Sequence, residues 1–87
     1  MADHKPRPIH TIAEEIVRDW PKPYFGAKPY LEAMYELTSI EDHYFFDSGR
    51  SIVAYFLSNA STWKGPKARE IKEELKTILQ PKSTRQV

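Results

Sequence analysis

The stretch Ser48-Gly49-Arg50-Ser51-Ile52-Val53-Ala54-Tyr55-Phe56-Leu57-Ser58-Asn59-Ala60 contains the densest apolar run of this 87-residue chain. Five apolar residues within it recur at the spacing of one helical face: Ile52, Val53, Phe56, Leu57 and Ala60. A buried strand competes with this interpretation, because the run is also rich in strand-forming residues. Asp47 or Ser48 before the run and Asn59 after it are capping residues, and they favour the helix. We therefore predict a central helix that neighbours cover on more than one side.

Three further helices are predicted around this stretch. The first has an apolar stripe from Ile9 to Trp20, a capping box formed by Thr11 and Glu14, and a stop at Pro21. The second begins near Pro29, and the last begins with Pro66 at its first position. For residues 38–46, between the second helix and the central helix, we predict only a short turn.

The fold class that these patterns predict is all-α, a compact bundle of about four helices with a central buried helix. Residues 1–8 are predicted to be a disordered N-terminal arm, 9–80 a single helical domain, and 81–87 a frayed C-terminal tail. The chain has no cysteine, its N-terminus lacks a secretory signal, and its longest apolar run is too short to span a bilayer. We therefore expect a soluble, cytoplasmic protein without membrane contact.

The formal net charge of +1 is too small to indicate a polyanion partner, but the charges are unevenly distributed. The segment between Lys28 and Arg50 has five acidic residues and no basic one, whereas seven basic residues face three acidic ones from Lys64 onward. These two regions can attract each other within the fold or between molecules, or they are ordinary solvated helix faces.

No arrangement of residues indicates catalysis or a cofactor. His10 and Glu14 are one helical turn apart, but a metal site needs at least three ligands. Asp42 and His43 are adjacent in a loop, and adjacent residues rarely face one another. The serines lack a nucleophile elbow, and the three glycines are isolated rather than gathered in a phosphate-binding loop. We therefore predict a protein that is not an enzyme, with no catalytic residue, no metal and no cofactor.

Aromatic residues make up 13% of the chain, and several lie in predicted loops. They either fill the core of a small domain or form an exposed binding surface. The second interpretation predicts an interaction module whose partner is an unknown protein or a second copy of the chain. Its candidate surface consists of five aromatic residues: Tyr24, Phe25, Tyr44, Phe45 and Trp63.

Nucleic-acid binding is the less favoured alternative. The central helix, a Gly-containing turn and the last helix superficially resemble a helix-turn-helix, with Lys64, Lys67 and Arg69 as candidate phosphate contacts. Three glutamates along the last helix oppose this interpretation, because they would repel DNA: Glu70, Glu73 and Glu74.

Between Ile9 and Leu79 the chain resembles a family of small uncharacterised proteins encoded by tailed bacteriophages and prophages. The similar segments, in order, are Ile9-His10-Thr11-Ile12-Ala13-Glu14-Glu15-Ile16, Asp19-Trp20, residues 23–34 (Pro23 to Met34), residues 51–60 (Ser51 to Ala60), Thr62-Trp63-Lys64-Gly65 and residues 68–75 (Ala68 to Leu75). The family has no established activity, so the resemblance assigns no site residue. It implies a phage or prophage product that acts in the bacterial cytoplasm.

Overall fold

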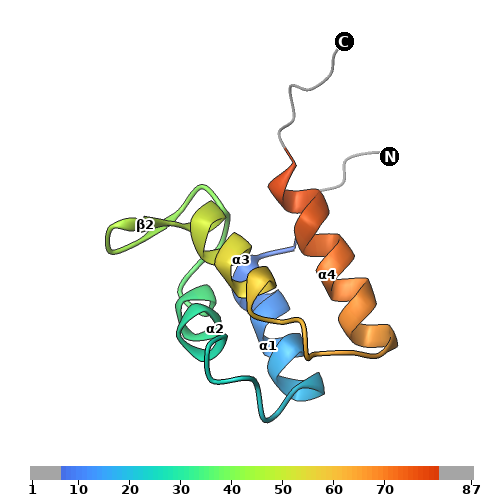
Figure 1. The fold of residues 1–87 in the computed structure, drawn as a ribbon. Coiled ribbons are helices and arrows are strands. Elements are labelled where there is room, and N and C mark those ends of the chain that lie inside the picture. Colours follow the sequence, from blue (N-terminus) through green and yellow to red (C-terminus); the bar gives the residue numbers. More distant parts are fainter. Residues whose placement is uncertain (1–6, 81–87) are drawn as a thin grey trace, which may run out of the picture.

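The computed structural model of the protein describes residues 7–80 (Figure 1). Its elements, in chain order, are α1 (Ile9–Asp19), α2 (Lys28–Met34), the strands β1 (His43–Tyr44) and β2 (Asp47–Ser48), α3 (Gly49–Ser58) and α4 (Pro66–Leu79). The prediction of a mostly helical domain with four helices is confirmed for this part of the chain. The small two-stranded sheet was not predicted. Most of the predicted arm and the whole predicted tail lie outside the described residues.

Helices α1 and α3 form the middle of the molecule, and α2 and α4 flank them on opposite sides (Figure 1). All four helices contribute buried apolar side chains to one core, with Phe56 of α3 completely buried at its centre. Helix α3 packs against α2 and α4, so it is covered on more than one side as predicted, but it is not buried all round. Its opposite face, with Ala54, Tyr55 and Ser58, is exposed.

The capping box predicted for the first helix is wrong. Helix α1 begins at Ile9, with Pro8 at its N-cap position and no side-chain cap. The first two amides of the helix donate instead to backbone carbonyls of the segment after α2, Ile9 N to Thr38 O and His10 N to Leu37 O, both at 2.9 Å. These two backbone carbonyls therefore supply the hydrogen-bond acceptors that a capping side chain would otherwise have to supply.

The side chain of Arg7 joins the two helices α1 and α4. Its guanidinium lies 2.7 Å from carboxylate oxygens of both Glu15 and Glu74. The hydrogen bond from Arg7 lowers the pKa of the Glu15 carboxyl. These ion pairs tie Arg7, which belongs to the predicted N-terminal arm, to the folded domain.

A short hairpin occupies the region predicted as a simple turn. Strand β1 pairs antiparallel with β2, so that His43 lies opposite Ser48 and Tyr44 opposite Asp47. The base of the hairpin is held by backbone hydrogen bonds, from Gly49 N to Asp42 O at 2.7 Å and from Arg50 N to Ile40 O at 3.0 Å. Ser48 then caps α3 by accepting from Ser51 N, as the sequence predicts.

Candidate interaction surfaces

The tip of the hairpin presents two phenylalanines to solvent. Phe45 is 82% exposed and Phe46 is 99% exposed, the largest values among the large apolar side chains that the structure describes. Phe45 has a φ of 56°, a left-handed conformation that L side chains rarely adopt. Tyr44 is half-buried and contacts the ring of Phe45 edge-on, with 4.7 Å between ring centroids. The hairpin projects from the body of the molecule beside the start of α3 (Figure 1).

Carboxylates surround the base of this apolar tip. Glu41 precedes the hairpin and Asp47 lies in β2, and both are exposed. Glu41 is partly neutralised by Arg50, whose guanidinium lies 3.7 Å from it. The carboxylate of Asp42 accepts hydrogen bonds from the amides of Thr38 and Ser39, and these bonds lower its pKa. The hairpin is therefore apolar at its tip and carries negative charge both beside the tip, at Asp47, and at its base.

Tyr24 and Phe25 form a second, separate aromatic site. They lie in the loop before α2, exposed and 4.9 Å apart between ring centroids. A Cβ built on Gly26 would lie 2.5 Å from the Tyr24 ring and 2.9 Å from Asn59 Oδ1, which places Tyr24 beside the end of α3. Since the hairpin adjoins the start of that helix, the predicted aromatic surface is split between the two ends of α3.

Trp63 does not belong to any exposed surface, contrary to the prediction. Only 2% of it is exposed. Its indole stacks on that of Trp20 at 5.6 Å and meets Phe56 edge-on at 6.3 Å. The indole Nε1 donates to Asp19 Oδ2 at 2.8 Å. Trp63 is therefore a core residue that packs between Trp20 and Phe56.

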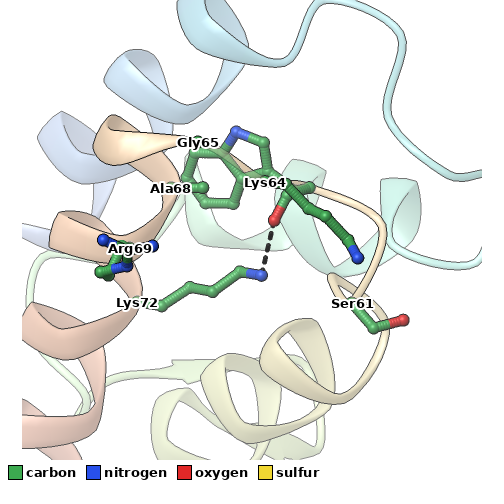
Figure 2. A pocket seen from close by; sticks show the side chains of 7 residues that line it. Ser61, Lys64, Gly65, Ala68, Arg69 and Lys72 are labelled. Atoms are coloured by element: carbon green, nitrogen blue, oxygen red, sulfur yellow. Dashed lines mark hydrogen bonds between the residues drawn. The ribbon is translucent and has the colours of Figure 1, made fainter.

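A basic hollow lies at the start of α4 (Figure 2). It has a volume of about 320 Å³ and is open to solvent, and its cations are Lys64, Arg69 and Lys72. The remaining lining consists of Ser61, Trp63, Gly65 and Ala68. In Figure 2, Lys72 lies between Arg69 on one side and Lys64 with Ser61 on the other. These residues form what we call the basic hollow.

Lys72 is the functional candidate that the sequence interpretation missed. Its ammonium donates to the carbonyl oxygen of Trp63 at 2.7 Å and lies 5.8 Å from the centre of the Trp63 ring. Desolvation lowers the pKa of Lys72, and the neighbouring charges of Lys64 and Lys76 lower it further. The spacing of Arg69 and Lys72 was the available signal, because residues three apart on a helix share one face.

Lys67 is not part of the basic hollow. It lines a different surface depression with Glu15, Arg18 and Asp19. Its ammonium lies 3.8 Å from the carboxylate of Glu70 in the next turn. The three predicted phosphate contacts are thus divided, with Lys64 and Arg69 together and Lys67 among acidic neighbours.

Within residues 7–80, no group of three or more histidine, aspartate or glutamate side chains is placed to hold a metal ion. In the same part of the chain, no helix combines the length and the apolar character that crossing a membrane requires.

Comparison of the chain with models of known protein families, with curated proteins and with solved structures finds no match. The resemblance to phage and prophage proteins therefore remains a hypothesis.

Proposed function

We propose that the protein is a small, non-catalytic protein–protein interaction module whose principal contact is the hairpin tip. The observation that supports this proposal is the exposure of Phe45 and Phe46 at the end of a hairpin. Burying a phenylalanine side chain contributes about 1.5–3 kcal/mol. Two such side chains at one tip can therefore act as the aromatic anchors that dominate many interfaces.

The fold alone gives no reason for these two residues to be apolar. A side chain that is 99% exposed, like that of Phe46, contributes no burial energy to the native state. Phe45 also takes a left-handed backbone conformation in which glycine or asparagine would be less strained. Contact with a partner accounts for both features, because the partner would bury the rings that the fold leaves in water.

We place this module in a phage or prophage product that acts in the bacterial cytoplasm. The support for this setting is the resemblance of the segments between Ile9 and Leu79 described above.

A capture experiment tests the proposed function. The full-length chain is immobilised and exposed to bacterial lysate, in parallel with a Phe45→Ser/Phe46→Ser variant and a Phe25→Ser variant. Phe25 is the matched control, because it is also an exposed phenylalanine but lies in the other aromatic site. We expect the double variant to lose specifically bound protein and the control to retain it. Equal capture by all three proteins would contradict the role of the hairpin.

Nucleic-acid binding is the second candidate, favoured by the three cations that line the basic hollow. Two observations weaken it: the Lys72 ammonium already donates to a backbone carbonyl, and Glu70 and Glu73 are exposed on the same helix. Mobility-shift titrations at two salt concentrations, with the wild type and a Lys64→Glu/Arg69→Glu variant, distinguish the candidates. Binding that weakens steeply with salt and is lost in the variant would support this function.

A further inference from the structure

We propose that the partner of the hairpin tip is a second copy of this chain, and that Phe45 and Phe46 of one copy dock in the basic hollow of the next. This inference rests on the proposed function, because it assigns a partner to the same hairpin. The hairpin and the hollow are then the two halves of one contact.

The chemistry of the two surfaces is complementary. The hairpin carries aromatic rings at its end and the exposed carboxylate of Asp47 directly beside them. The carboxylate of Asp42 at its base already accepts from the amides of Thr38 and Ser39. The hollow carries the cations Lys64, Arg69 and Lys72 around Trp63 and Ala68, which are themselves almost fully buried. Ammonium and guanidinium groups bind the faces of aromatic rings and also pair with carboxylates. The hollow thus offers partners to both parts of the hairpin.

The size of the hollow also fits a side chain at the end of a two-residue turn. Its volume of about 320 Å³ lies at the lower end of the range for ligand sites, which is about 300–1,000 Å³. Gly65 is exposed, and a Cβ built there would meet no atom within 4 Å, so no side chain covers this edge of the hollow. A phenylalanine at a narrow tip can enter such a hollow, whereas a flat protein surface cannot.

The two surfaces lie on opposite sides of the molecule. The hairpin adjoins the start of α3, whereas the hollow lies at the start of α4, on the far side of the domain (Figure 1). The hairpin of one copy therefore cannot reach the hollow of the same copy, and the contact must join different copies. Because each copy uses two different surfaces, the association is head to tail and forms rings or open chains.

The contact is small, so we expect the association to be weak. It includes charged pairs, so we also expect its strength to depend on the salt concentration. Raising the salt concentration from about 0.1 M to about 1 M shortens the Debye length from about 10 Å to about 3 Å. We expect this change to weaken the association by screening the charged pairs, while burial of the rings preserves part of it.

Sedimentation velocity of the full-length protein tests the inference with two complementary variants, Phe46→Ser and Arg69→Glu. Both positions are exposed, so both variants should fold. We expect the average mass of the wild type to rise with protein concentration into the millimolar range, and either variant alone to associate more than tenfold more weakly. An equimolar mixture of the two variants should form dimers but nothing larger, because only one intact hairpin can meet one intact hollow.

Three results would overturn the inference: a wild type that stays monomeric, self-association that Phe46→Ser leaves unchanged, or a mixture of variants that stays monomeric. Matching thermal unfolding of both variants controls for folding, and Lys64→Glu replaces Arg69→Glu if that variant is unstable. The proposed function can hold even if this inference fails. If the wild type is monomeric but lysate capture still depends on Phe45 and Phe46, the partner is a different protein and only the inference about a second copy fails.

Discussion

Gly49 shows how a single residue fixes the junction between the hairpin and α3. A Cβ at this position would lie 2.9 Å from both the Cα and the carbonyl oxygen of Ile40. Because these are backbone atoms, they cannot move aside as a flexible side chain would. The loop that carries the hairpin can therefore approach α3 only where α3 has no side chain.

We expect Gly49→Ala to destabilise the protein by about 1–3 kcal/mol, the usual cost of overpacking. Urea unfolding of the variant measures the change. Ser58→Ala is the matched control, since Ser58 is exposed on the same helix and its effect should stay within about 0.5 kcal/mol. A Gly49→Ala variant as stable as the wild type would show that Ile40 does not pack this closely.

Arg7 makes stability depend on pH through Glu15. The hydrogen bond from Arg7 lowers the pKa of this carboxyl below its ordinary value of 4.5 in the folded state. A carboxyl with a lowered pKa stabilises the fold above its unfolded pKa, and this contribution is lost as the pH falls through the folded value. The stabilisation is therefore complete near neutral pH and disappears in acid.

We expect Arg7→Met to be less stable than the wild type by about 1 kcal/mol near pH 7, because two partly exposed ion pairs are lost. The difference between the two proteins should shrink as the pH falls below 4.5. Thermal unfolding of both proteins, from pH 7 to below pH 4.5, measures this difference in stability. A difference that is constant with pH would indicate that Arg7 acts through packing and not through its charge.

At the scale of the elements, the sequence predicted the helices better than their connections. Apolar spacing located α1 and α3, and Pro29 and Pro66 marked the starts of α2 and α4. The hairpin was missed because each strand has two residues and its turn depends on an unusual conformation of Phe45, which no local pattern encodes. The division of Lys67 from Arg69 follows from helix geometry, since residues two apart point to different sides.

The loop between α3 and α4 is joined to α1 through Trp63. Replacing Trp63 with Phe removes the indole donor to Asp19 and part of the stack on Trp20. We expect a loss of about 1–3 kcal/mol, because the Asp19 carboxylate loses its donor and the smaller ring leaves space in the core. Near-ultraviolet circular dichroism should lose the signal of the stacked indoles. Asp19→Asn is the control, because it retains a side-chain oxygen that can accept and should preserve that signal.

At the scale of the whole molecule, one core joins all four helices, and Phe56 is completely buried within it. The sequence predicted this central position from the apolar spacing of residues 52–60. It could not predict that Trp63 belongs to the same core while Phe45 and Phe46 do not. Composition does not distinguish these aromatics, because their burial depends on contacts between distant parts of the chain.

We expect Phe56→Ala to cost about 3–5 kcal/mol, a large part of the stability of so small a domain. Phe46→Ser is the matched control, and it should leave the thermal midpoint nearly unchanged because the ring is exposed. Calorimetry of both variants measures the two effects. Similar midpoints for the two variants would contradict the placement of the core.

The backbone contacts at the start of α1 also affect when this helix can be completed during synthesis. Helix α1 has 11 residues, and isolated helices shorter than about 12–15 residues are marginal in water. Its first two amides find their acceptors at Leu37 and Thr38, which a ribosome adds almost thirty residues later. A nascent chain that ends before Leu37 therefore has an incomplete α1. Helix α1 gains these two hydrogen bonds only after the segment that follows α2 has been added to the chain.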